Sequence, residues 1–375
     1  MRNNSTHAMF PDATHDEQAL QNYIKTLRVF STRNFHRGNK ALLNARIEPA
    51  LRRKSGNKMP ARKDVREALA REELNQWWSA MVRTTQEMLY DSVGPSIERQ
   101  LPELTARAKR LRGKRGSLTL DPAVKVPPYL AAVDMHCKPG SYQQELGEDD
   151  VFPGAEFDRT FRLYSMGGLG PDLDDQGRTL IKWLKAKFPD FKPRRVLDLG
   201  CTVGHSTLPY CDAFGKNVEV HAIDVAAPCL RYGHARAVAM GKDVHFRQAN
   251  AETLPFPDAH FDLVVSHALM HETSTKAIRA IYREAHRVLA PGGVMAHLDG
   301  IMPHDLYEKY YSEWMAHYNN EPFLGTVQDE DFAGICKQAG FKPEKTFVDW
   351  TTPALKPRAT DDNVVVEYII VAGQK

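Results

Sequence analysis

The chain has 375 residues, of which 42% are hydrophobic and 26% are charged, the ordinary balance of a soluble globular protein. The length suggests about two domains. A formal net charge of +3 does not indicate a nucleic-acid-binding protein. The five cysteines form no C-x-x-C pair, which disfavours a disulfide framework or a zinc knuckle and favours reduced thiols in a cytoplasmic protein. No apolar run is long enough for a membrane span, and the polar N-terminus lacks the apolar core of a secretory signal.

Residues 1 to about 15 read as a mobile tail, and apolar residues then recur at helical spacing from 16 to about 111. We therefore expect an N-terminal helical domain over 1–128, with a linker after Gly113. Trp77 and Trp78 suit a core or an interface more than a substrate pocket. The helical region leaves a homodimer open.

Two basic clusters punctuate this region and either bind RNA or an acidic partner or form solvated helix faces, the second reading being favoured. The first holds Arg52, Arg53, Lys54, Lys58, Arg62 and Lys63, and the second holds Arg107, Lys109, Arg110, Arg112, Lys114 and Arg115.

Residues 129–178 combine turn formers, acids and aromatic side chains, which predicts an irregular segment. Such a segment serves as a lid over a binding site or as a strap packed on the surface. In the first case Tyr164 is the expected contact with a cofactor.

From Gly177 onward, strands alternate with helices, which indicates a parallel sheet covered by helices on both faces. This pattern defines an α/β domain over 179–375. The expected strands are 195–199, 218–223, 244–248, 261–266, 293–298, 344–350 and 364–371, and the expected helices include 227–240, 274–289 and 328–339.

Ligands of an open parallel sheet bind at the carboxyl ends of the strands, where this chain places acids and glycines. The strand at 195–199 contains Asp198 and leads into Gly200 and Gly204. A dinucleotide site needs G-x-G-x-x-G, but Thr202 and His205 occupy its second and third glycine positions. An acid at this turn suits a cationic ligand better than a phosphate.

The next strand ends at Asp224, whose carboxylate can accept from two ribose hydroxyls. Further on come the segment Gln248–Phe256, the strand ending at His267, and the sequence Arg287-Val288-Leu289-Ala290-Pro291-Gly292-Gly293. In this order and spacing, the motifs resemble class I S-adenosylmethionine (SAM)-dependent methyltransferases, and specifically the small-molecule type of ubiquinone and menaquinone biosynthesis. The resemblance covers about half of the chain, and Thr202 and Asn250 depart from the usual Gly and Asp.

The resemblance implies a Rossmann-like methyltransferase sheet, mostly parallel with an antiparallel C-terminal strand. It also implies SAM as the cofactor, with its ammonium group near Asp198, its ribose on Asp224 and its adenine beside Asn250. The full set of expected cofactor contacts is Asp198, Gly200, Cys201, Gly204, Asp224, Val225, Asn250, Ala251, Glu252, His267 and Tyr164.

Several polar residues fall near strand ends and have three alternative roles. One histidine acts as a general base, with His271 and then His267 as the catalytic candidates. Alternatively, a set of four residues holds a metal ion, or the histidines only form a polar wall; we expect no metal. The metal set would be His267, His271, His297 and Asp299, and His205 and His304 are the other histidines of this group.

Residues 301–325 are rich in aromatics at spacings of three and four, which predicts an amphipathic helix. This insertion either caps the substrate or packs against the N-terminal domain. An aromatic wall there would suit a flat substrate or a sulfonium cation.

The sequence thus predicts a cytoplasmic SAM-dependent methyltransferase that methylates O, N, C or S of a small-molecule acceptor. The first alternative is an RNA or protein methyltransferase that uses the basic N-terminal region, and the second is a non-catalytic SAM-binding protein. Neither a membrane nor a nucleic acid is expected as a partner.

Overall fold

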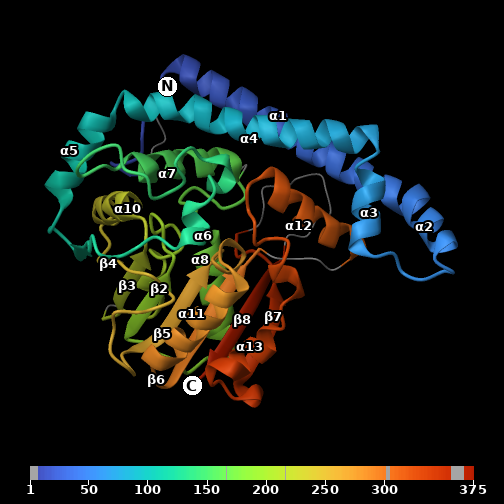
Figure 1. The fold of residues 1–375 in the computed structure, drawn as a ribbon. Helices are drawn as coiled ribbons and strands as arrows, with labels where there is room; N and C mark the ends of the chain where they lie inside the picture. The colour runs from blue at the N-terminus through green and yellow to red at the C-terminus, as the bar shows by residue number, and fades with distance from the viewer. Residues whose placement is uncertain (1–6, 166, 216, 301–304, 356–366) are drawn as a thin grey trace.

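The computed structural model describes residues 7–165, 167–215, 217–300, 305–355 and 367–375. Its centre is one eight-stranded sheet with the order β1-β4-β3-β2-β5-β6-β8-β7 (Figure 1). The strands are β1 (Ser117–Thr119), β2 (Arg195–Leu199), β3 (Glu219–Asp224), β4 (His245–Gln248), β5 (Phe261–His267), β6 (Leu289–Asp299), β7 (Thr346–Thr351) and β8 (Tyr368–Gln374).

The pairings from β1 through β6 are parallel, and only β8 runs antiparallel to its neighbours β6 and β7. The predicted mostly parallel sheet with an antiparallel C-terminal strand is therefore confirmed. The first residues of the expected strand 364–371 lie outside the described residues. The observed strand β8 ends at Gln374 rather than at Val371, because it pairs with β6 as far as Val294.

Helices cover both faces of the sheet, so the apolar side chains of its central strands are buried on both sides. On one face, α11 (Thr275–Val288) and α13 (Phe332–Ala339) bury residues such as Ile281 and Ile335. On the other, α8 (Asp175–Lys187), the short α9 (Tyr210–Ala213) and α10 (Ala227–Ala239) bury Leu180, Tyr210 and Leu230. Figure 1 shows α11 and α13 in front of the strands.

The N-terminal part is helical, as predicted, and forms a layer beyond one end of the sheet (Figure 1). Its long helices α1 (His15–Leu42) and α4 (Glu73–Glu98) lie side by side, and α4 contacts α7 (Phe152–Tyr164), which in turn packs on α10. The remaining helices are α2 (Glu48–Lys54), α3 (Arg62–Leu69), α5 (Leu101–Leu111) and α6 (Pro128–Ala131).

The expectation of a mobile tail is wrong for the described residues that precede α1. His7, Met9 and Phe10 are buried, and Met9 belongs to the core cluster that joins α4, α5, α7 and α10. So short a polar stretch has too few apolar residues to show helical or strand periodicity. Its buried His7 and Phe10 rings and Met9 nevertheless hold it against the fold.

The expectations of a linker after Gly113 and of an irregular segment over 129–178 are also wrong in part. The linker contains β1, which pairs with β4 at the sheet edge; Gly116 permits this approach, since a Cβ there would lie 2.1 Å from the Val244 carbonyl oxygen. The segment 129–178 contains α7, a 13-residue helix that is buried along most of its length. Its rings stack on one another and on His205 of the turn after β2, contacts that local turn propensity cannot show.

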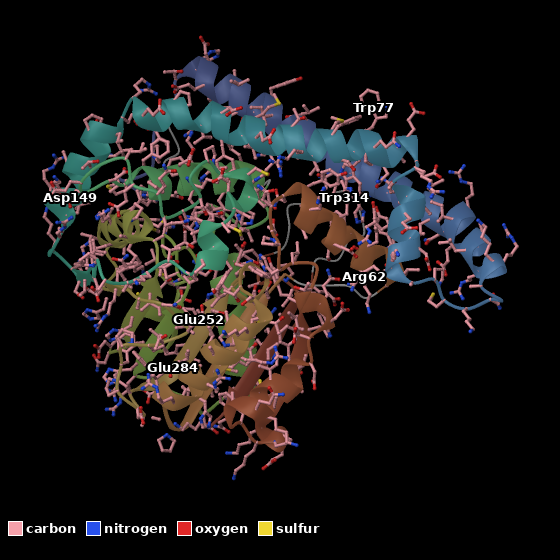
Figure 2. All side chains as sticks on the ribbon, viewed as in Figure 1. Arg62, Trp77, Asp149, Glu252, Glu284 and Trp314 are labelled. Atoms are coloured by element: carbon pink, nitrogen blue, oxygen red, sulfur yellow. The ribbon has the colours of Figure 1, made fainter. Side chains whose placement is uncertain are left out.

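The insertion after β6 forms α12 (Leu306–Tyr318), and residues 301–304, including His304, lie outside the described residues. Of the two predicted roles, packing against the N-terminal helices is the one the described residues of α12 adopt. Trp314 stacks on Trp78 of α4 at 4.1 Å between ring centroids, and its Nε1 donates to Ser79 Oγ at 2.9 Å. Trp78 is buried as predicted, whereas Trp77 is 60% exposed and projects outward from α4 (Figure 2).

Within the described ranges, no helix is both long and apolar enough to cross a membrane.

Candidate functional site

A cavity of about 370 Å³ lies where the carboxyl ends of β2, β3 and β5 meet α7 and the segment 127–143. Residues from the strand ends line one side, and aromatic side chains of α7 line the other. The lining comprises Pro127, Tyr129, Leu130, Met135, His136, Ser141, Tyr142, Gln143, Phe157, Phe161, Tyr164, Gln176, Asp198, Gly200, Cys201, Thr202, His205, Ser206, Ile223, Asp224, Val225, Ala226, Ala249, Asn250, Ala251, His267, Ala268, Leu269, His271, Glu272, Thr273, Ile281 and Glu321.

Asp198 ends β2 with a buried carboxylate that is only partly hydrogen-bonded. Its Oδ2 accepts from Thr207 Oγ1 at 2.5 Å, whereas Oδ1 has no hydrogen-bond partner among the described residues. His267 Nδ1 lies 3.3 Å from Oδ1, and His267 Nε2 lies 3.2 Å from Tyr210 OH. Since a buried carboxylate oxygen is costly to leave without a donor, this atom is suited to bind a cationic group in the cavity.

The turn after β2 brings its backbone close to the cavity. Gly200 has φ +70°, and a Cβ at this position would lie 2.8 Å from Leu269 Cδ1, so a side chain would be both strained and obstructed. Asp224, at the end of β3, accepts from the amides of Thr202 and Ala226, each at 2.9 Å. Burial raises the pKa of Asp224, an effect that these amide donors oppose.

The adenine-side residues expected from the sequence fall at and beside the cavity. Asn250 and Ala251 line it, and Asn250 Oδ1 accepts from the Glu252 amide at 2.9 Å. Gly204 and Glu252 are not among the lining residues: Glu252 Oε1 accepts from Tyr129 OH at 3.0 Å, and Gly204 adjoins the ring of Phe246. Glu252 therefore holds Tyr129, which lines the cavity, and Gly204 lies against Phe246 of β4.

Cys201, Val225 and Tyr164 also line the cavity. Burial raises the pKa of the Cys201 thiol well above its usual value, so this cysteine is a neutral apolar contact. Tyr164 comes from α7, where its ring stacks with Phe161 at 6.0 Å and lies 5.0 Å from the guanidinium carbon of Arg28. The segment expected to act as a lid thus contributes an aromatic wall.

His271 is paired with a buried carboxylate from the neighbouring strand. Its Nδ1 lies 2.5 Å from Asp299 Oδ1, and Asp299 Oδ2 accepts from the Met270 and His271 amides at 2.9 and 3.3 Å. Its Nε2 lies 3.3 Å from Glu272 Oε1. Burial disfavours the charged imidazole, but Asp299 and Glu272 outweigh burial and hold the pKa of His271 well above its ordinary value. A base role for His271 therefore requires that it lose this proton as substrate binds.

The four residues considered as a metal set do not converge. His297 is fully buried, bonds Ser266 Oγ through Nδ1 at 2.6 Å, and stacks on Tyr282. Burial lowers the pKa of His297 to about 3, and neither His297 nor Asp299 lines the cavity. His267 instead sits between Asp198 and Tyr210. This metal hypothesis is wrong because side chains alternate across a strand: His297 stacks on Tyr282 on one face of the sheet, whereas His267 contacts Tyr210 on the other.

Sequence reasoning missed three residues that meet His271 in the cavity. Glu272 Oε1 lies 3.0 Å from His136 Nε2, and the same nitrogen lies 3.2 Å from Glu321 Oε1. Burial disfavours charge on His136, but Tyr142, Glu272 and Glu321 raise its pKa well above the ordinary value. Of the three, only Glu272 could have been suspected from the sequence, because it follows the candidate His271 directly. His136 and Glu321 lie in segments far from His271 in the sequence.

Comparison with known proteins points to the same family as the residues at the strand ends. A methyltransferase domain family matches residues 196–293, which span β2 to the first half of β6. The ubiquinone/menaquinone biosynthesis C-methyltransferase UbiE of Vibrio vulnificus is 36% identical over 171 residues, covering 40% of this chain and 64% of that protein. The corresponding protein of Psychromonas ingrahamii is 35% identical over 147 residues, covering 37% and 55%.

Other similar proteins include an uncharacterised protein of Haemophilus influenzae, 24% identical over 46% of this chain and 67% of its own length. The YcgJ protein of Bacillus subtilis has a solved structure that covers 52% of this chain and 97% of its own, with 21% identity and a TM-score of 0.38. The chain thus spans about half to two thirds of the curated relatives it matches. Residues 196–293 form a class I SAM-dependent methyltransferase domain whose core resembles the ubiquinone and menaquinone biosynthesis C-methyltransferases.

Proposed function

We propose that this chain transfers a methyl group from SAM to a small-molecule acceptor bound in the cavity at the strand ends. The observation that carries the proposal is the composition of that one cavity. Acidic and amide side chains of the methyltransferase core line one part, and an aromatic wall with an imidazole–carboxylate cluster lines another. A concave site with a few convergent polar groups and perturbed pKa values is typical of an active site.

The residues of the first part fit SAM. The Oδ1 atom of Asp198 is buried without a hydrogen-bond donor and suits the ammonium group. Asp224 lines the cavity and retains lone pairs for the ribose hydroxyls beyond its two amide contacts. Val225, Asn250 and Ala251 line the part of the cavity where we place the adenine. When bound, SAM supplies an electrophilic methyl group on a sulfonium.

The protein's own contribution is to hold the acceptor against the cofactor and to exclude water. The rings of Tyr142, Phe157 and Phe161 form the wall opposite the strand ends and suit an apolar or flat acceptor. Orienting two reactants in this way supplies much of the acceleration in a methyl transfer. His271 is the candidate that handles a proton of the acceptor, whereas His267 supports the cofactor through Asp198.

The charge distribution favours a small acceptor over a nucleic acid. In both basic clusters, several cations are already paired with carboxylates of the same chain. Arg52 pairs with Glu48, Arg62 with Asp329 and Glu313, Arg107 with Glu103, Lys109 and Arg112 with Asp149, and Arg115 with Asp243. Paired cations release fewer counterions on binding a polyanion, which weakens the RNA alternative.

The test is SAM turnover by the full chain with fractions of a metabolite extract, measured as S-adenosylhomocysteine release and a new product mass of one added methyl group. We expect release that depends on a small-molecule fraction. Tight SAM binding without release from any fraction would favour the non-catalytic alternative, and release only with added RNA would favour the nucleic-acid alternative. Either result would overturn the proposal.

A further inference from the structure

We propose that His136, Glu272 and Glu321 bind a divalent transition-metal ion at the acceptor end of the cavity. These three side chains come from separate parts of the chain. His136 lies in a short helical turn, Met135–Cys137, Glu272 ends the turn Met270–Glu272 after β5, and Glu321 follows α12. All three line the cavity, and one nitrogen and two carboxylate oxygens lie within 4.8 Å of one another.

Two of the three distances between the donor atoms match those around a metal ion, and the third, between the two carboxylate oxygens, is within 4.8 Å. His136 Nε2 lies 3.0 Å from Glu272 Oε1 and 3.2 Å from Glu321 Oε1. Two ligands that are each about 2.1 Å from a metal lie about 3 to 3.4 Å apart at octahedral or tetrahedral angles. An ion that enters among these atoms takes the place of the proton on His136 Nε2, which is released to solvent.

Hydrogen-bond partners around His136, Glu272 and Glu321 orient these side chains, as the residues around metal ligands usually do. Tyr142 OH lies 2.5 Å from His136 Nδ1, which leaves Nε2 directed at the two carboxylates. The Asn319 side-chain amide donates to Glu321 Oε1, and His271 Nε2 adjoins Glu272. A ligating histidine whose other ring nitrogen is fixed by an oxygen is the usual arrangement in metal sites.

One observation points to a ligand beyond an internal ion-pair cluster. The Oε2 atom of Glu272 is buried and has no hydrogen-bond partner among the described residues, although a carboxylate oxygen in such surroundings needs one. The Glu321 side chain is only 5% exposed. Three protein ligands beside a cavity leave further coordination positions open, as in catalytic rather than structural metal sites.

The donor set selects the class of metal. An imidazole nitrogen favours zinc, iron, copper or nickel over magnesium and calcium, and carboxylates also accept manganese. With no cysteine among the donors, thiolate-selected copper(I) is disfavoured. We therefore expect Zn²⁺ and Mn²⁺ to bind and Mg²⁺ to bind far more weakly. In the context of the proposed methyl transfer, the open positions are free for an oxygen or nitrogen atom of the acceptor.

The experiment measures metal binding by the full chain without turnover. Protein treated with a chelator and dialysed is titrated with ZnCl₂, MnCl₂ or MgCl₂ by calorimetry, and bound metal is counted by elemental analysis. We expect one Zn²⁺ per chain, with Glu321→Gln and His136→Asn each weakening its binding by more than about tenfold. Glu284→Gln is the control, because Glu284 is an ion-paired glutamate on α11 whose side chain is 18% exposed and does not line the cavity.

If a variant fails to fold, X-ray absorption of the zinc-loaded wild-type chain decides instead, with imidazole and carboxylate ligands at about 2.0 to 2.2 Å expected. The absence of stoichiometric Zn²⁺ or Mn²⁺ binding by the wild-type chain would overturn the proposal, as would undiminished binding by folded Glu321→Gln and His136→Asn. The methyltransferase proposal is tested separately by SAM turnover, so failure of the metal proposal and failure of the methyltransferase proposal can be told apart.

Discussion

The Asp158 carboxylate of α7 and the His205 imidazole of the turn after β2 lie 2.9 Å apart, Oδ1 to Nε2, and both are buried. Asp158 Oδ2 also accepts from Tyr232 OH at 2.8 Å and lies 3.0 Å from His7 Nε2. This one carboxylate therefore joins the N-terminal segment, α7, α10 and the turn that lines the cavity. Because His205 follows Gly204 directly, the helical layer and the expected cofactor turn are coupled through Asp158.

Replacing Asp158 should destabilise the fold and loosen the cavity together. Asp158→Asn removes a buried charge whose partners stay buried, which we expect to lower the free energy of unfolding by about 3 kcal/mol. Urea denaturation measures this change. Asp149→Asn is the control: Asp149 pairs with Arg112 and Lys109 near the surface (Figure 2) and should cost less than about 1 kcal/mol. Equal losses in the two variants would contradict the role given to Asp158.

The same pair makes a prediction about pH. Burial, assisted by Arg236, lowers the pKa of His205 to about 4, against about 6.5 in the unfolded chain. Between these values the unfolded state binds the proton and the folded state does not. The contribution of His205 to stability is thus complete above pH 6.5 and falls by about 1.4 kcal/mol per pH unit as the pH drops towards 4.

We expect His205→Asn to show a shallower loss of unfolding free energy than the wild type between pH 6.5 and 4. The control is His15→Asn, because the His15 side chain is 90% exposed and should leave the slope unchanged. The comparison between variants cancels the carboxylates that titrate in the same range. Parallel slopes for wild type and His205→Asn would show that His205 titrates normally in the folded chain.

The two adjacent tryptophans of α4, Trp77 and Trp78, allow the loss of a buried ring to be compared with the loss of an exposed one. Trp78 is buried against Tyr311 and Trp314 of α12, so Trp78→Ala leaves a cavity and should cost about 3 to 5 kcal/mol. Trp77→Ala, one residue away and exposed, should change the unfolding free energy by about 0.5 kcal/mol or less. Denaturant titration of both variants measures this contrast, which disappears if α12 does not dock on α4.

The core strands and the positions of Asp198 and Asp224 beside the cavity could be predicted because their signals are local. Short, mostly apolar runs mark β2 and β5, and Asp198 and Asp224 follow from their positions near strand ends. His136, Glu321 and Asp158 could not be predicted in this way, since their partners lie far away in the sequence and meet only after the helical layer packs on the sheet. The same holds for β1, whose three residues become a strand only beside β4.

The cofactor proposal is tested at Asp224. Asp224→Asn keeps the shape of the side chain but removes the charge that strengthens bonds from the ribose hydroxyls, so we expect SAM affinity to fall by about tenfold to hundredfold. Calorimetric titration with SAM measures the dissociation constant. Asp243→Asn makes the same change of charge at the surface, where Asp243 pairs with Arg115, and should bind SAM as the wild type does. Equal affinity in the two variants would remove Asp224 from the cofactor site.

His271 and His267 should differ in the kinetic parameter that each affects. His271 faces the acceptor end with Asp299 behind it, so His271→Gln should lower kcat by about 10² to 10⁴ if it carries a proton of the acceptor, with little change in SAM affinity. His267 lies 3.3 Å from Asp198 Oδ1, so His267→Gln should weaken SAM binding more than it lowers kcat. Single-turnover kinetics and SAM titration of both variants separate the two effects. An acceptor that has no proton to lose, such as a thioether, would instead leave kcat of His271→Gln near the wild-type value, and His271 would then be a residue that only shapes the pocket.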